Sequence, residues 1–152
     1  MDIKPKKVDT HPEAAIAPGY LVNHAARLFN RGMDVALRPH GLTLALLGPL
    51  LLLSWKGAML QRDLVRSSAV KQPAMAALLD KLDAMGLIKR TASMADRRAA
   101  LVDLTDQGRE AARIGGEALV EANQRGLDGF SAEDAAHLVL LLQRLVANFE
   151  RE

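Results

Sequence analysis

The sequence predicts a mainly α-helical fold in which a short two-stranded hairpin follows a pair of short helices. Leucine and alanine supply most of the apolar residues and favour helices, whereas only 3% of the chain is aromatic. Residues 96–105 place three charged side chains ahead of alternating apolar and polar ones, and they end on Thr105, which can cap a helix. This combination is typical of a winged helix-turn-helix, with residues 96–105 forming the tip and returning strand of a two-stranded wing.

The N-terminal segment is predicted to contain an arm and one long helix. Three prolines punctuate residues 1–18, so we expect a flexible arm there. From Gly19 onward, apolar side chains recur at helical spacing until Pro39 and Gly41 interrupt the pattern. We therefore expect residues 19–41 to form a long helix.

The central residues 42–104 are predicted to form a compact lobe. Thr43 can cap a helix that reaches about Trp55, and Pro49 predicts a kink or a late start in that helix. Two short helices and then two strands follow, at residues 61–67, 71–85, 87–91 and 99–104. This order of elements is that of a winged helix-turn-helix.

Residues 105–152 are predicted to form two further helices. Thr105 caps the first, with Asp106 in its first turn, and Ser131 caps the second. The apolar stripes of these helices and of residues 19–41 lie outside the lobe and need a partner surface. We therefore expect them to be dimerisation helices of a homodimer.

Charge is concentrated in the middle of the chain. Residues 56–98 contain nine cations and four anions, a net charge of +5, whereas the rest of the chain has eleven cations and fourteen anions, a net charge of −3. A basic segment between acidic ends favours a surface that binds a polyanion. Chance clustering on a solvated surface is the alternative, and charge by itself does not exclude it.

Several classes of function lack their usual signals. The chain has no cysteine, which removes disulfides and thiolate sites and fits a cytoplasmic location. The longest apolar run, residues 42–55, is too short to span a bilayer. The four histidines lack metal-ligand spacing, the serines lie in no nucleophile motif, and no glycine-rich phosphate loop is found. We expect no enzyme, no cofactor, no metal and no membrane association.

A series of short motifs runs in register through residues 40–108. They are HGLT at 40–43, LQRDLV at 60–65, VKQPAM at 70–75, LDKLDAMGLIKR at 79–90, DRR at 96–98 and LTDQG at 104–108. Their order and spacing resemble the MarR family of bacterial transcriptional regulators. The resemblance implies a homodimer with one helix in each of two successive major grooves and a wing in the flanking minor groove. It also implies release from an operator by a small molecule, often an anionic phenolic compound.

The wing supplies the first expected DNA contacts. A narrow A·T-rich minor groove concentrates negative potential and attracts a guanidinium, so we expect Arg98 to enter it. In the family's Asp-x-Arg pattern, which Asp96 and Arg98 match, the acid orients the base, and we expect Arg97 to contact phosphate. A surface ion pair of negligible worth is the alternative.

The helix at residues 71–85 is the expected recognition helix. Its plausible contacts are Lys71, Gln72 and Lys81. Gln72 can bond both edges of an adenine, and the lysines favour phosphate or guanine. The chain departs from the family where hydroxyl or basic side chains are usual, at Ala74, Ala76 and Ala77. Candidate phosphate anchors on the preceding helix are Gln61, Arg62 and Arg66, for which ordinary solvated helix charges are the alternative.

An effector site is expected between the dimerisation helices and the lobe, as the resemblance implies. Arg27 could pair with a carboxylate while His24 bonds a second oxygen, with Asn23 beside them and Trp55 as a flat wall. The alternative is that Trp55 is core, that Arg27 makes an interface ion pair, and that His24 is a satisfied interface histidine. The leading hypothesis is a ligand-responsive repressor. The alternative is a dimeric ligand- or protein-binding module with weak or nonspecific DNA binding.

Overall fold

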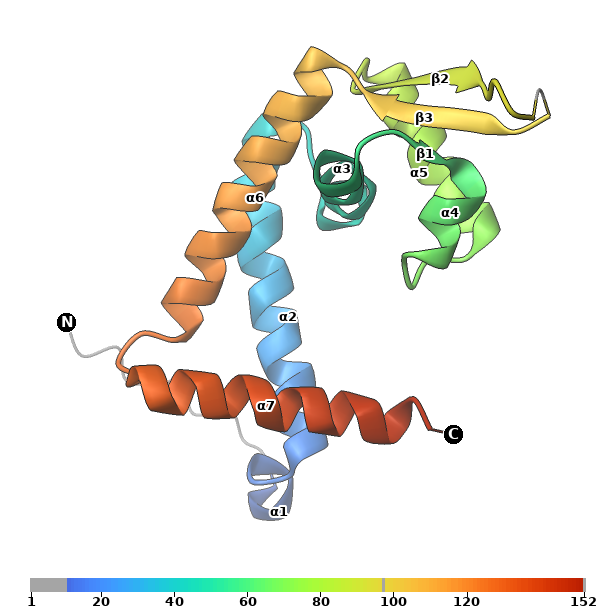
Figure 1. Ribbon diagram of the computed structural model, residues 1–152. Helices are drawn as coiled ribbons and strands as arrows, with labels where there is room; N and C mark the ends of the chain where they lie inside the picture. Colours follow the sequence, from blue (N-terminus) through green and yellow to red (C-terminus); the bar gives the residue numbers. More distant parts are fainter. Residues whose placement is uncertain (1–10, 97, 152) are drawn as a thin grey trace.

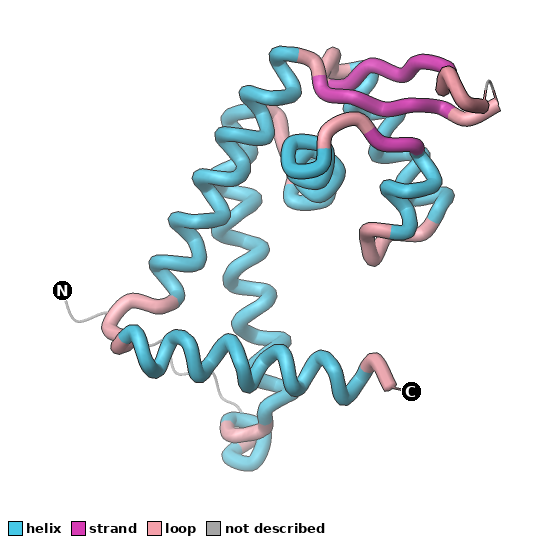
Figure 2. The backbone as a smooth tube through the Cα atoms, viewed as in Figure 1, coloured by secondary structure: helices cyan, strands magenta, loops and turns pink. Residues whose placement is uncertain are grey.

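The computed structural model describes residues 11–96 and 98–151, and its elements follow the predicted order (Figure 1). Its helical elements are α1 (Pro12–Ala15), α2 (Pro18–Leu37), the 3-10 turn η1 (Arg38–His40), α3 (Leu44–Lys56), α4 (Gln61–Arg66), α5 (Gln72–Ala84), α6 (Asp106–Gly126) and α7 (Ala132–Phe149). The strands are β1 (Met59–Leu60), β2 (Ile88–Ala92) and β3 (Ala100–Leu104). Figure 2 shows that helices and strands occur together in one lobe, which is made of α3, α4, α5 and the sheet. The long helices α2, α6 and α7 extend away from this lobe. The predicted mainly α-helical winged fold is confirmed.

Side-chain caps set the start of three helices, as the sequence predicts. The hydroxyl oxygen of Thr43 accepts a hydrogen bond from the N–H of Leu46 at 3.3 Å, and those of Thr105 and Ser131 accept from the N–H three residues on at 3.0 Å. Each cap satisfies a backbone donor that a helix start otherwise leaves unpaired. Thr43 and Thr105 thus mark the two boundaries between the lobe and the long helices, and Ser131 marks the start of α7 after α6.

The structure differs from two predictions about where helices begin. Helix α3 runs through Pro49 without interruption, so the predicted late start does not occur. Pro49 leaves the carbonyl of Ala45 without its helical donor, but Ala45 is exposed, so water can bond that oxygen. In the predicted arm, the described part contains the one-turn helix α1 and the first residue of α2.

The sheet has three strands in the order β1-β3-β2, which corrects the predicted two-stranded wing. Both pairings are antiparallel: Met59 pairs with Val102 and Ile88 pairs with Leu104. Strand β1 escaped prediction because two residues are too few to show an alternating pattern. Its pairing with β3 attaches the start of α4 to the base of the wing.

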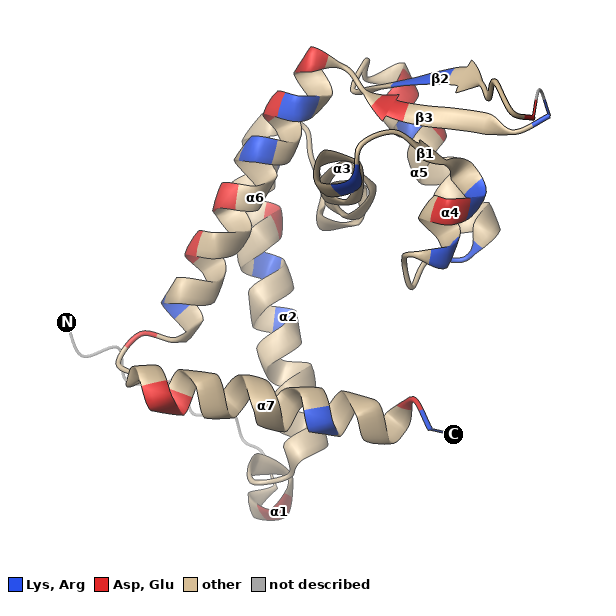
Figure 3. Ribbon diagram, viewed as in Figure 1, with Lys and Arg blue, Asp and Glu red and all other residues tan. Residues whose placement is uncertain are grey.

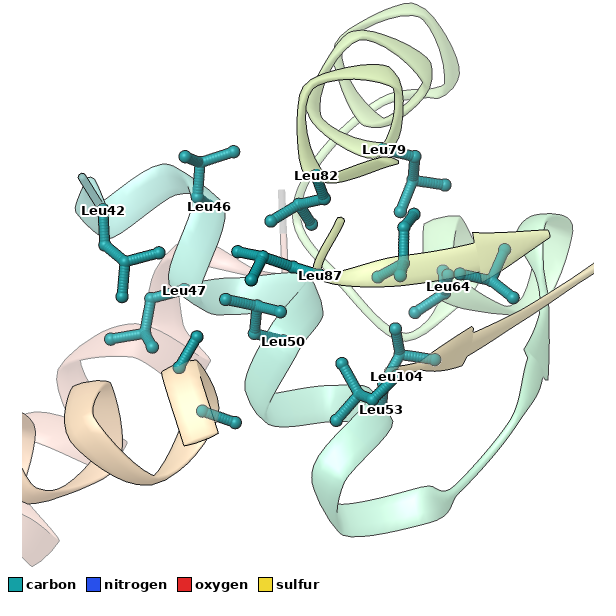
Figure 4. Close-up of a cluster of buried hydrophobic side chains, with 14 of the residues drawn as sticks. Leu42, Leu46, Leu47, Leu50, Leu53, Leu64, Leu79, Leu82, Leu87 and Leu104 are labelled. Atoms are coloured by element: carbon teal, nitrogen blue, oxygen red, sulfur yellow. The ribbon is translucent and has the colours of Figure 1, made fainter. Parts of the chain in front are cut away.

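The core of the lobe is built around α3, which contacts α5, α6 and β3 (Figure 4). Buried leucines of α3 meet leucines of α5 and the sheet, and side chains such as Leu50, Leu79 and Leu82 have no exposed surface. Burying a leucine contributes roughly 1.5–3 kcal/mol, so this cluster is the main stabilising element.

The lobe docks on α6 at two glycines. A methyl group on Gly108 would overlap the backbone carbonyl of Leu87, and one on Gly115 would overlap a methyl of Leu47. The hydroxyl of Thr105 also donates to the carbonyl oxygen of Gly86 at 2.6 Å. Close packing and this bond hold the start of α6 against the end of α5.

The outer helices leave much apolar surface uncovered. Helix α7 crosses the far end of α2 and α6 in Figure 1, and none of its residues is buried. Its exposed apolar side chains include Leu140, Leu141, Val146 and Phe149. Within the described residues, no single helix meets the length and apolarity needed to cross a membrane. Helices α2 and α3 reach that limit only as a pair bent by 76°.

Candidate nucleic-acid interface

A polar groove of about 370 Å³ lies between the start of α4, the start of α5 and the wing. Five of the predicted DNA-contacting residues line it: Gln61, Arg62, Gln72, Asp96 and Arg98. The fold explains why they meet. Leu60 of β1 pairs with Leu101 of β3, which places the first residue of α4 beside the wing. The first turn of α5 closes the third side.

The tip of the wing is ordered by hydrogen bonds of its own. A carboxylate oxygen of Asp96 accepts from the backbone N–H of Arg98 at 3.0 Å, and the N–H of Ser93 donates to the carbonyl of Ala99 at 2.9 Å. Asp96 therefore fixes the backbone from which the Arg98 side chain starts. The exposed side chain of Arg98 extends from this fixed turn. Arg97 lies outside the described residues.

Three predicted cations lie outside the groove. Lys71, which precedes α5, and Lys81 on α5 are both exposed, and Arg66 on α4 is 3.6 Å from the carboxylate of Asp63. Figure 3 shows Lys and Arg on α4 and on the wing strand β2. The exposed face of α5 carries Ala74 and Ala77, so this helix presents few side chains that can read a base edge.

Arg90, which no sequence pattern singled out as a site residue, links the wing to α5. From β2 its Nη2 lies 2.8 Å from Asp80 and 3.0 Å from Asp83, both on α5, and its Nε donates to Asp83 at 3.2 Å. The bond to Asp80, then that to Asp83, raises the pKa of Arg90. The available signal was a pair of acids three residues apart on a helix that turns directly into a strand bearing an arginine.

The predicted effector residues do not share one cavity within the chain. On α2, the amide of Asn23 donates to the carbonyl of Gly19 at 2.8 Å, and the ring of His24 stacks on Tyr20 at 6.0 Å. Arg27 is exposed on the same helix. Trp55, at the end of α3, is 79% exposed, so the alternative that it belongs to the core is wrong.

Trp55 instead lines an apolar pocket of about 550 Å³ between α3 and the turn from α4 to α5. The lining residues are Leu44, Ala45, Gly48, Pro49, Leu51, Leu52, Trp55, Ser67, Ser68, Val70 and Met75. None of them is charged. The hydroxyl of Ser68 contacts the carbonyls of Val65 and Val70 and accepts from the N–H of Val70, so it shapes the turn that leads into the recognition helix.

The chain is similar to known regulators of transcription. The MarR family model matches residues 42–100. A transcriptional repressor of the helix-turn-helix type from Mycobacterium tuberculosis is 29% identical over 127 residues, which cover 84% of this chain and 91% of the relative.

Two solved structures share the fold. A probable transcriptional regulator from Pseudomonas aeruginosa is 29% identical with a TM-score of 0.76, covering 86% of this chain and 98% of its own. BpsR of Bordetella bronchiseptica, described as having its DNA binding regulated by 6-hydroxynicotinic acid, is 25% identical with a TM-score of 0.74, covering 84% and 97%.

Proposed function

The chain belongs to the MarR family of transcriptional regulators, and on that premise we propose that it is a homodimeric repressor that binds a palindromic operator and is released by a small ligand. The observation that carries this proposal is the polar groove, which gathers Arg62, Gln72 and Arg98 from three separate elements. Such a convergence of donors beside an exposed helix suits a duplex, whose grooves and phosphates present acceptors side by side. A DNA partner also accords with the proposed cytoplasmic location.

Each element has a distinct part in the proposed complex. Helix α5 enters the major groove with Gln72 at its leading end. Arg98 reaches the minor groove from a turn that Asp96 holds in place, which reduces the freedom lost on binding. Arg62 neutralises phosphate between them and sets the position of the lobe without reading sequence.

The outer helices support the proposed homodimer. Among residues 11–96 and 98–151 nothing covers the apolar side of α7, and α2 also exposes Leu28 and Val35, whose exposed fractions are 51% and 61%. Uncovered apolar stripes of this length are typical of subunit interfaces. A two-fold dimer would present two lobes to two half-sites of a palindrome.

The apolar pocket beside Trp55 is the proposed effector site. Its volume suits a small molecule, and binding there would press on the Ser68 turn that leads into α5. Because no lining residue is charged, the pocket itself suits the aromatic or aliphatic part of a ligand. An acidic group on that ligand would need a cation from beyond the lining, such as Arg27 or His24 of either protomer.

A mobility-shift titration tests DNA binding. The chain's own upstream DNA and a random duplex are compared between about 50 and 200 mM salt, where phosphate contacts weaken steeply. We expect a clear preference for the upstream DNA and a loss of that preference in Arg98→Ala. Arg113→Ala on α6, which removes an exposed cation outside both the lobe and the apolar faces of α2 and α7, is the matched control. Equal affinity for both duplexes would refute the repressor and favour the module with nonspecific binding, which the alanine-rich face of α5 also suits.

Fluorescence tests the effector site, because Trp55 is the single tryptophan of the chain. Titration with simple aromatic acids and with their uncharged amides should change its emission and should weaken operator binding in parallel. Ala45→Phe fills the pocket and should abolish both responses while leaving operator binding intact. Release of the operator without any change in Trp55 emission would place the effector elsewhere.

A further inference from the structure

Arg90 bonds two carboxylates of α5 from a neighbouring strand, on the side of the lobe where we expect DNA to bind. Arg90 lies on β2, at the residue that pairs with Val102 in the middle of the sheet. Its guanidinium bonds Asp80 and Asp83 on the helix expected to enter the major groove. The arginine side chain is 28% exposed, whereas those of Asp80 and Asp83 are 70% and 46% exposed. The carboxylates thus face the side from which a nucleic acid would approach.

The charges of α5 alone disfavour contact with DNA. Between Gln72 and Ala84 the helix carries Asp80, Asp83 and a single cation, Lys81. Carboxylates at the floor of a groove lined by phosphates are repelled, and little water remains there to screen them. Arg90 brings the net charge of this surface to zero, because a guanidinium stays protonated throughout the physiological pH range.

Arg90 is also next to the wing arginine. A shallow hollow of about 290 Å³ is lined by Arg90, Thr91, Ala92, Arg98, Ala99 and Ala100. Arg98 in turn lines the polar groove with Gln72. A continuous surface therefore runs from the two carboxylates of α5, through Arg90, to the groove.

We propose that Arg90 is a positioning residue for DNA binding, which holds the wing against the recognition helix and masks Asp80 and Asp83 from the phosphates. The proposal rests on the proposed function. Arg90 itself need not touch DNA. It acts through α5, which could not approach the duplex closely with both carboxylates unpaired.

A set of charge variants distinguishes neutralisation of the two carboxylates from an ion pair that only stabilises the fold. Arg90→Gln removes the positive charge, and Arg90→Lys keeps that charge but cannot bond both acids at once. The pair Asp80→Asn and Asp83→Asn removes the two negative charges that Arg90 neutralises. The matched control is Arg113→Gln on α6. Arg113 also bonds two acids, with Glu117 at 2.7 Å, but it lies outside the lobe. Thermal stability, operator affinity and its salt dependence are measured for each full-length protein.

We expect Arg90→Gln to weaken operator binding about tenfold, less than the loss of a fully buried charge pair causes, because Asp80 and Asp83 are 70% and 46% exposed. Adding both asparagines to Arg90→Gln should restore most of that affinity, although it restores no contact between the wing and α5. Arg90→Lys should fall between wild type and Arg90→Gln. The asparagines alone should leave an unpaired Arg90 and steepen the salt dependence.

Several results would overturn the proposal. Recovery is the decisive readout, because a purely structural bond predicts that the triple variant binds as poorly as Arg90→Gln. An equal loss in Arg113→Gln, or an unchanged affinity in Arg90→Gln, would also reject masking. Failure of the wild-type protein to prefer its operator would refute the proposed function itself, and that failure is seen before any variant is compared.

Discussion

Replacing Gly108 by alanine should separate the effects of helix propensity and of packing where the lobe meets α6. Alanine is favoured over glycine in a helix by up to about 1 kcal/mol. The added methyl, however, would overlap the carbonyl of Leu87 and lie 3.2 Å from a methyl of Leu104. That carbonyl belongs to the backbone and accepts the N–H of Thr105 at 3.1 Å, so it cannot rotate away. Overpacking costs typically about 1–3 kcal/mol, and weakening this hydrogen bond about 1 kcal/mol more.

The net expectation is a loss of about 2 kcal/mol, which lowers the melting temperature by about 4–8 °C in a chain of this size. Gly116→Ala is the matched control, because its methyl would meet a methyl of Leu51 at 3.6 Å, an ordinary contact. That variant should gain up to about 1 kcal/mol. Thermal unfolding followed by circular dichroism at one protomer concentration measures both, since a dimer's stability depends on concentration. Equal stability of the two alanine variants would refute the reasoning.

Three further predictions concern charge, assembly and pH. Lys81→Ala should weaken binding to operator and random DNA alike and reduce the salt slope by about one, as for a phosphate contact, which titrations at several salt concentrations would reveal. Leu141→Asp, on the uncovered face of α7, should shift the protein to monomers in sedimentation and remove operator binding. Arg109 bonds Asp106 at 2.7 Å, and this hydrogen bond lowers the pKa of that carboxyl. The contribution of this ion pair to stability is therefore complete above the ordinary pKa of the carboxyl and is lost as pH falls through the lowered pKa. Arg109→Gln should lower the melting temperature more near pH 7 than in acid below that pKa, where only the bond from Arg109 to the carbonyl of Leu104 is lost, and thermal unfolding at both pH values measures the difference.

Local sequence signals predicted most of the fold. Thr43, Thr105 and Ser131 sit at helix starts because a short hydroxyl or its equivalent is needed there, and that need is visible without tertiary structure. Strand β1 was missed because it is formed by pairing with β3, forty residues further along, and its two residues carry no period of their own. The late helix start predicted at Pro49 is wrong. The free energy that a proline costs inside a helix depends on whether water reaches the carbonyl that loses its hydrogen bond, and the sequence does not show this.

The candidate site was predictable only for those residues that belong to a local sequence motif. Gln72 and Arg98 could be chosen from their place in a motif, and the fold brings them to one groove. The partners of Arg90 and the backbone bond of Asp96 depend on how side chains from different elements are turned, which spacing along the chain does not specify. Trp55 shows the same limit. The sequence left open whether its ring belongs to the core or forms the wall of a pocket, and only the structure shows that the end of α3 presents it beyond the edge of the core.

The alanine-rich recognition helix leads to a prediction about the operator. Ala74 and Ala77 can offer only methyl contacts, so the base pairs beneath them should tolerate exchange, with thymine favoured for its own methyl group. Gln72 and Arg98 line one groove, so the strict positions should lie beneath the start of α5 and in the adjoining A·T-rich minor groove. Saturation mutagenesis of the operator in a binding assay would map this pattern. Gln72→Ala should relax selectivity at one strict position, at a cost of about 1–3 kcal/mol. Uniform strictness across the half-site would show that the exposed face of α5 reads bases despite its alanines.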